Sequence, residues 1–196
     1  HSKYIRNKMK ILIIYAHPKT EGYGPTILDE TKKILKRKNM NYEVIDLYGI
    51  KYDPVLNEKE HSPFNKNNLS KETLHFQNMI KEADLQIYIY PIWWASMPAI
   101  LKGFFDRVFT SHFAFQYKDG RHLKLLKGKK AIVMTTCGAP WFFYKYLARA
   151  PIWIIKNGIL GFCGIKTKVN LLGNCIDYNK KKEEKIKRFV RKSLKF

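Results

Sequence analysis

The sequence predicts an α/β fold in which a doubly wound, five-stranded parallel sheet carries helices on both faces. Short apolar runs of strand length alternate with segments of helical periodicity along the chain, which is the pattern of a parallel sheet. The apolar runs are continuous rather than alternating, as expected for strands buried on both faces. The 196 residues, 45% of them hydrophobic, suit one globular domain. We expect residues 9–196 to form that domain and residues 1–8 to be a tag or a flexible N-terminal extension.

The individual elements follow from apolar runs and from helix-start signals. Ser70 is a suitable N-cap, and Pro25 and Pro98 suit the first turns of helices. Residues 57–69 form a polar stretch that we expect to be a loop, with a solvated His61. The expected strands are residues 10–15, 42–47, 85–90, 129–136 and 166–172, and the expected helices are residues 25–38, 71–82, 98–109, 152–162 and 178–196.

The stretch 83–117 organises the candidate site. Pro91 is expected to end the strand at 85–90, because proline has no N–H for the ladder, and the loop that follows contains Trp93 and Trp94. In an open α/β sheet, ligands bind at the C-terminal ends of the strands. The two rings are either packing residues or the walls of a site for a flat aromatic ligand. An extended backbone would point them to opposite faces, which favours the ligand wall.

Residues 90–109 read YPIWWASMPAILKGFFDRVF. This segment resembles the signature of the flavodoxin-like NAD(P)H:quinone oxidoreductases, which include the DT-diaphorases, the bacterial modulators of drug activity and an ancillary subunit of a potassium efflux system. The resemblance extends from Ile11 to about Gly164. It implies flavodoxin-like strand order, a flavin cofactor, and two-electron reduction of quinones or related electrophiles by NAD(P)H in a ping-pong mechanism. A flavodoxin-type electron carrier and a regulatory subunit of a potassium efflux system are the alternatives.

Residues 17–24 form the first strand-to-helix turn, where free backbone N–H groups and the helix dipole favour a phosphate. On its own this segment could equally be an ordinary loop. The resemblance implies a flavin phosphate site, but the Ser-Phe-Asn usual in the family is replaced here by Gly22-Tyr23-Gly24. Binding would then depend on backbone N–H groups, Thr20 and His17. We expect FMN, with FAD as the other candidate.

The turn after the strand at 129–136 lies at the same edge of the sheet. The resemblance implies that Thr135, Thr136, Cys137 and Gly138 contact the polar edge of the flavin. The Cys137 thiol lies either near the flavin or in the interior as an inert small hydrophobe. The loop residues that would surround the ring system are Pro91, Ile92, Trp93, Trp94 and Ala95.

The resemblance also implies two catalytic residues and a partner subunit. Tyr144 matches a tyrosine that stabilises negative charge on the reduced flavin, and Arg149 would supply the positive charge of a histidine that this chain lacks. Phe115 and Tyr117 match aromatic residues that reach across a dimer interface, so with Trp94 they would line the substrate pocket. We therefore expect a homodimer with the active site at the interface and a quinone-like acceptor.

The net charge of +21 is extreme for this length. It indicates either nucleic-acid binding or lysine-rich solvated faces, with local runs at residues 32–38 and 180–192. No nucleic-acid motif accompanies the charge, so we expect no nucleic acid and keep a peripheral membrane or channel partner as a possibility. The three cysteines are odd in number, which favours free thiols, a reducing compartment and a cytoplasmic protein. No metal site and no membrane span are expected.

Overall fold

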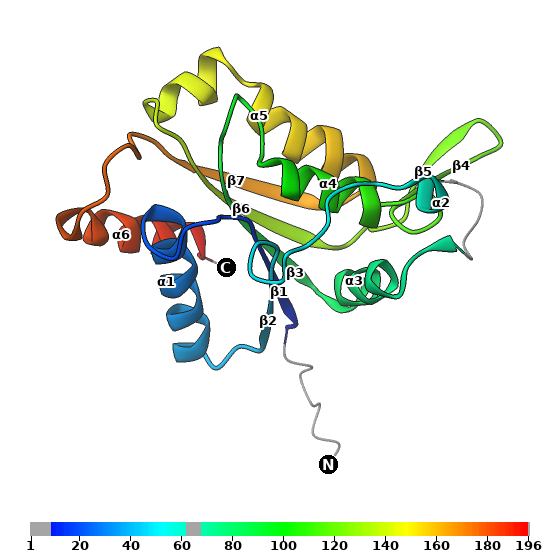
Figure 1. Ribbon diagram of the computed structural model, residues 1–196, viewed down its shortest axis with the longest axis horizontal. Coiled ribbons are helices and arrows are strands. Elements are labelled where there is room, and N and C mark those ends of the chain that lie inside the picture. The colour runs from blue at the N-terminus through cyan, green and yellow to red at the C-terminus, as the bar shows by residue number, and fades with distance from the viewer. Residues whose placement is uncertain (1–8, 62–67, 196) are drawn as a thin grey trace.

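The computed structural model describes residues 9–61 and 68–195; the prediction for residues 1–8 and the side chain of His61 lie outside this description. Five strands form a parallel sheet in the order β2-β1-β3-β6-β7 (Figure 1). Counted along the chain, this is the flavodoxin order 2-1-3-4-5, so the predicted fold class is confirmed. The strands are β1 (Ile11–Tyr15), β2 (Tyr42–Asp46), β3 (Leu85–Pro91), β6 (Lys130–Thr136) and β7 (Lys166–Leu172).

Alternating side chains of the strands build one core on each face of the sheet. In β1, Leu12 and Ile14 belong to the core under α3 (Lys71–Glu82) and α4 (Ala99–Val108). Ile11, Ile13 and Tyr15 belong to the core under α1 (Tyr23–Arg37) and α6 (Glu183–Ser193). Both faces are therefore covered, which explains the unbroken apolar runs in the sequence.

The local helix signals are largely confirmed. The Ser70 hydroxyl accepts a hydrogen bond from the backbone N–H of Thr73 at 3.1 Å and caps α3. α1 begins at Tyr23, so Pro25 lies inside its first turn, where a missing N–H costs nothing. The C-terminal helix is shorter than expected, because 3-10 helix η4 (Lys180–Lys182) precedes α6.

The prediction that Pro91 ends the strand was wrong. β3 continues through Pro91, which pairs with Thr136 of β6. Ile92 donates its N–H to Thr136 O on β6 at 2.7 Å, so the nitrogen of Pro91 faces the opposite side of the strand, toward β1. The pairing of β1 with β3 ends at Tyr15 and Ile89, so no strand of the described chain is present there to accept a hydrogen bond from residue 91. A proline is tolerated there because no ladder bond is lost.

The expected α-helix at 152–162 is mostly of another type. α5 (Ala150–Trp153) passes into π-helix η3 (Ile154–Gly161), and π-helix η2 (Phe143–Leu147) precedes it. π-Helices are rare and depend on their surroundings, so an apolar periodicity that fits an α-helix cannot reveal them.

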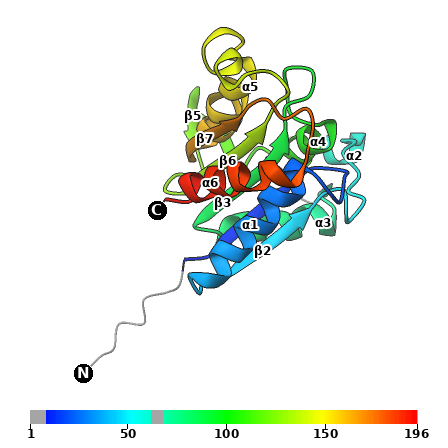
Figure 2. The same cartoon turned by 90° about the vertical axis from the view of Figure 1, so that its left-hand side faces the viewer.

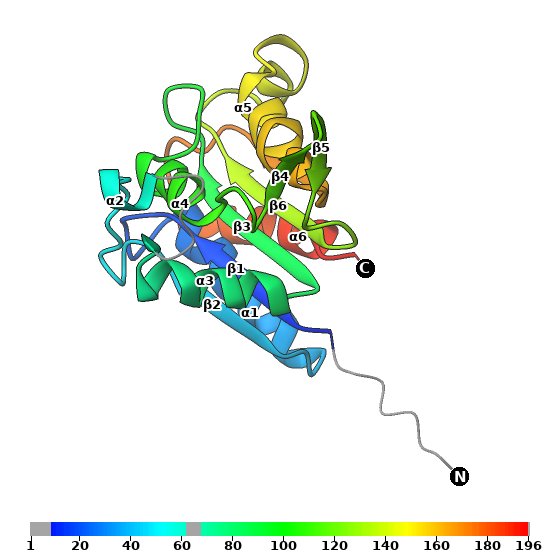
Figure 3. The same ribbon diagram turned by 90° about the vertical axis from the view of Figure 1, so that its right-hand side faces the viewer.

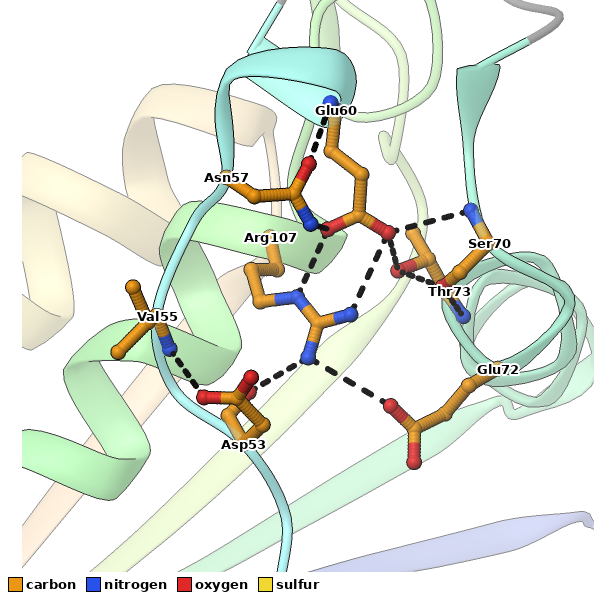
Figure 4. Close-up of polar contacts among 8 residues, drawn as sticks. All are labelled: Asp53, Val55, Asn57, Glu60, Ser70, Glu72, Thr73 and Arg107. Carbon is orange, nitrogen blue, oxygen red and sulfur yellow. Dashed lines mark hydrogen bonds and ion pairs between the residues drawn. The ribbon is translucent and has the colours of Figure 1, made fainter.

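Two further elements were not predicted. Residues 110–127 contain a hairpin of β4 (Phe115–Lys118) and β5 (Arg121–Lys124), which extends from the side of the molecule shown in Figure 3. The polar stretch at 57–69 begins with a short helix, α2 (Glu58–His61). Glu60 of α2 is buried against Arg107 of α4, which joins α2, α3 and α4 in one polar network (Figure 4).

Candidate functional site

A cavity of about 570 Å³ lies at the C-terminal edge of the sheet, where the segments after β1, β3, β6 and β7 meet. Its volume is in the range of small-molecule and cofactor sites. The predicted residues that line it are His17, Gly22, Tyr23, Pro91, Ile92, Trp93, Thr136, Cys137 and Gly138.

The N-terminus of α1 points its free backbone N–H groups toward this edge. Gly22, the N-cap, has φ +122°, a conformation that residues with a Cβ adopt at a cost. Its carbonyl accepts hydrogen bonds from Thr26 N–H at 3.1 Å and from the Thr26 hydroxyl at 2.7 Å, which fixes the turn. Within the described chain no side chain caps α1, so the N–H groups of Tyr23 and Gly24 are positioned to receive an anion.

His17 lies between this helix and the tryptophan loop. Its Nδ1 accepts a hydrogen bond from Lys19 N–H at 3.1 Å, and its ring centroid lies 6.1 Å from that of Trp93. A Cβ at Gly24 would lie 2.9 Å from the imidazole, so this glycine allows the histidine to pack against α1. Burial, together with the nearby charge of Lys19, lowers the pKa of His17. The side chain is therefore neutral near pH 7 and acts as a hydrogen-bonding group rather than a cation.

The two tryptophans do not lie on an extended backbone. Trp93 and Ser96 exchange both backbone hydrogen bonds at 2.9 Å, and Trp94 and Ala95 have φ of 49° and 54°, as in a type I′ turn. Trp93 lines the cavity, whereas the Trp94 side chain is fully exposed. Positive φ in a bulky residue stores strain, and such strain clusters at functional sites.

Cys137 continues the edge after β6. Its N–H donates to Leu172 O at 3.0 Å, so this N–H is not available to a ligand, although the residue lines the cavity. The adjacent Gly138 is exposed and lines the cavity. The Cys137 thiol is buried and donates to Ala139 O at 3.2 Å, and burial raises its pKa, as expected for an unreactive thiol.

Sequence reasoning missed the segment after β7. Cys175, Ile176 and Tyr178 line the cavity together with Glu21 and Lys19. This segment is attached to α1, because Tyr23 Oη donates to Asp177 O at 3.0 Å and the hydroxyls of Tyr178 and Thr26 lie 3.0 Å apart. The signal was present, because every parallel strand ends at this edge of the sheet.

Several predicted residues do not line the cavity of the single chain. Thr135 is buried within the sheet, and no partner for its hydroxyl occurs among the described residues. Tyr144 lies on η2, and Arg149 is exposed before α5. Phe115 and Tyr117 lie on the hairpin, where the ring centroids of Phe115 and Phe162 are 5.0 Å apart. Trp94 and Ala95 form the exposed tip of the tryptophan turn.

Thr20 lines a second, smaller cavity of about 350 Å³ on the other side of Gly22. Glu21, Gly22 and Tyr178 border both cavities. The charged lining of the second cavity is mixed, with three lysines and four carboxylates: Lys33, Lys180, Lys187, Glu21, Asp29, Glu30 and Glu183. In residues 9–61 and 68–195, no group of three or more histidine, cysteine, aspartate or glutamate side chains could hold a metal ion.

The profile of the family described as "Flavodoxin-like fold" matches residues 9–195. This chain belongs to that family. It is 32% identical, over 81% of its length and 80% of the other, to a Haemophilus influenzae protein named an uncharacterized NAD(P)H oxidoreductase. It is 30% identical, over 80% of its length and 78% of the other, to human ribosyldihydronicotinamide dehydrogenase (quinone).

Two solved structures are similar to this chain over nearly its whole length. Smu.1420 from Streptococcus mutans has a TM-score of 0.82 and 32% identity, over 96% of this chain and 100% of that one. The NAD(P)H:quinone oxidoreductase of Methanothermobacter marburgensis has a TM-score of 0.80 and 26% identity, over 94% of each chain. Among the helices in the described part of the chain, none is long and apolar enough to cross a membrane.

Proposed function

We propose that this chain is a flavin-dependent oxidoreductase that uses NAD(P)H to reduce quinones or related electrophiles. The observation that carries the proposal is the cavity at the sheet edge, where the uncapped N-terminus of α1 and the half-exposed ring of Trp93 border one space. A phosphate and a flat ring system need those two features side by side. The relatives named as NAD(P)H oxidoreductases and quinone dehydrogenases support the same reaction.

The residues present fit a flavin. The turn at Gly22 leaves space at the position of a Cβ, and the N–H groups of Tyr23 and Gly24 would hold the phosphate. The Glu21 carboxylate would repel a phosphate here, and the Lys19 ammonium would offset that repulsion. Most of the phosphate binding would therefore come from backbone N–H groups. Pro91, Ile92 and Trp93 would flank the ring, and Thr136 and Gly138 would meet its polar edge.

The chemistry that a bound flavin supplies is two-electron transfer, from NAD(P)H in one half-reaction and to the acceptor in the next. The protein's own part is to bind the flavin, to orient it and to polarise its ring system. Tyr144 on η2 and Arg149 before α5 would stabilise negative charge on the reduced flavin. Arg149→Ala should slow reduction by NAD(P)H in stopped-flow measurements, with Lys145→Ala, which removes a neighbouring positive charge, as the control. An unchanged reductive half-reaction in Arg149→Ala would exclude this role.

A homodimer would complete the site. Large apolar side chains remain exposed on the tryptophan turn and on residues 141–153, and such exposed apolar patches are typical of interfaces. They are Trp94, Trp141, Phe142, Tyr146, Leu147 and Trp153. Trp94, with Phe115 and Tyr117 from the partner, would line the acceptor pocket. Leu147→Glu should convert the dimer to a monomer in sedimentation velocity experiments; a wild-type monomer with full activity would contradict the arrangement.

FMN is the expected flavin and the cytoplasm the expected compartment. Mass spectrometry of the flavin released from purified protein distinguishes FMN from FAD.

The test of the function is the absorbance of purified protein at roughly 450 nm, followed by NADPH under argon and then a naphthoquinone. Loss of absorbance with NADPH and recovery with the quinone are expected. Gly22→Ala should weaken FMN binding about tenfold, because its positive φ costs a side chain energy. Gly120→Ala, at a positive-φ hairpin turn with equally open space, is the matched control. Failure of the wild type to bind either flavin when it is supplied in excess would refute the function.

A further inference from the structure

Two basic segments that are far apart in the sequence lie side by side in the structure. Residues 32–38 contain five basic and no acidic side chains, and residues 180–195 contain nine basic and two acidic ones. These 23 residues carry +12 of the net charge of +21. They form the C-terminal half of α1 and the whole of α6, which pack against each other on one face of the sheet (Figure 2). The charge of this protein is therefore concentrated on one face.

The two helices enclose a groove of about 620 Å³ with an apolar floor and a basic rim. Ile34 of α1 and Leu194 of α6 form the floor. The rim consists of Arg37, Lys38, Arg191 and Lys195. The basic surface continues past Lys33, Lys36 and Lys187 along the same pair of helices.

Glu30 keeps the two arginines at the groove. Its carboxylate is almost buried and lies 3.5 Å from Arg37 Nη2 and 3.8 Å from Arg191 Nε. Arg191 Nη2 also lies 3.8 Å from Glu184 Oε2, and Arg37 Nε donates to Lys33 O at 3.4 Å. Each guanidinium has five N–H donors, so these partners leave some of them available to an anion. The side chains of Arg37 and Arg191 are both more than half exposed.

We propose that this α1–α6 face binds the surface of anionic phospholipid membranes, with a lipid phosphate between Arg37 and Arg191. Clustered lysines and arginines are attracted to the negative surface potential of such membranes. The floor residues Ile34 and Leu194 are only 6% and 2% exposed, so a lipid headgroup would be held at the basic rim of the groove and not inserted between the helices. The only aromatic residue of the two segments in the described chain, Phe189, packs on the core, so bases have no stacking surface here.

This inference does not depend on the proposed function, because membrane binding requires no turnover. The apolar side of α6 is not free to insert, since Ile186, Val190 and Leu194 are buried in the core. The association is therefore electrostatic and peripheral, and it should weaken as ionic strength rises.

The experiment is co-sedimentation of the full chain with vesicles of equal parts phosphatidylglycerol and phosphatidylcholine, and with phosphatidylcholine alone, at low and physiological salt. The test variant is Lys33→Gln/Lys36→Gln/Lys195→Gln, and the matched control is Lys71→Gln/Lys81→Gln/Lys118→Gln. The control removes the same charge from exposed lysines of α3 and the hairpin. The test variant should bind anionic vesicles about a hundredfold more weakly than the wild type, and the control much less so.

Circular dichroism verifies that both variants are folded. Equal losses in the two variants would mean that total charge, not this face, drives binding, and would overturn the proposal. Binding to neutral vesicles that equals binding to anionic ones would also overturn it. A gel shift of duplex DNA or RNA at physiological salt that is stronger than vesicle binding, and is lost in the test variant, would assign the face to nucleic acid instead.

Discussion

Arg107→Met should destabilise the protein strongly, because it leaves the carboxylate of Glu60 buried without its cation. Arg107 Nε donates to Glu60 Oε2 at 2.9 Å and Nη2 donates to Oε1 at 3.3 Å, with both side chains less than a tenth exposed (Figure 4). Removing one member of a buried ion pair costs about 3–5 kcal/mol. In urea this corresponds to a midpoint lower by about 1–2 M.

The pH dependence identifies the cause. Burial by itself raises the pKa of Glu60, but hydrogen bonds from Arg107 and Ser70 outweigh it and hold the pKa below its usual value. In the wild type this stabilisation is present above the unfolded-state pKa, near 4.5, and is lost as the pH falls through the folded pKa. In Arg107→Met, burial raises the pKa of Glu60, so protonation relieves the penalty. The difference in unfolding free energy between the wild type and Arg107→Met should therefore become smaller as the pH falls from 7 to 4.5.

The matched control is Lys102→Met on the same helix. Lys102 pairs with Asp106 at 2.6 Å, but both side chains are about half exposed, so the loss should stay under about 1 kcal/mol. Glu60→Leu/Arg107→Met should recover most of the stability, because an apolar pair leaves no buried charge. The assay is urea unfolding followed by tryptophan fluorescence. A loss in Arg107→Met as small as that of the control, or equal at both pH values, would refute the reasoning.

Three further outcomes are expected. Gly103→Ala should cost about 3 kcal/mol or more in thermal or urea unfolding, since the new Cβ would lie 2.2 Å from Pro54 O; stability equal to that of Gly120→Ala would contradict this. Ser70→Ala should cost about 1 kcal/mol through the lost N-cap of α3, and Ser111→Ala, outside any cap, should be near neutral in the same assay. Burial raises the pKa of Cys175 to about 11, so its alkylation by iodoacetamide, followed by mass spectrometry, should be slow at pH 7.5 and rise about tenfold per pH unit. Labelling at the rate of the urea-unfolded chain would show that the thiol is not protected.

The sequence alone determined the sheet and the helices that depend on local signals. The central strands β1, β3 and β6 are runs of mostly apolar residues that can be buried only between two layers, so these strands could be located from composition and spacing. Ser70 capped α3 as expected, because a cap is formed by residues a few positions apart. The edge at which the strands end placed His17, Trp93 and Cys137 in one cavity, since parallel strands all end on the same side.

The tertiary structure decided what depends on contacts between distant segments. Trp94 and Ala95 adopt positive φ, although nothing in their chemistry favours it, and an apolar periodicity at 154–161 became a π-helix. The segment after β7 lies at the site because Tyr178 contacts Thr26 of α1. The basic residues of 32–38 and 180–195 lie on the same face because α1 packs against α6. Glu60 pairs with Arg107, which is 47 residues away in the sequence. Local propensity is blind to such pairings, because their free energy comes from burial and from partners that only the folded chain brings together.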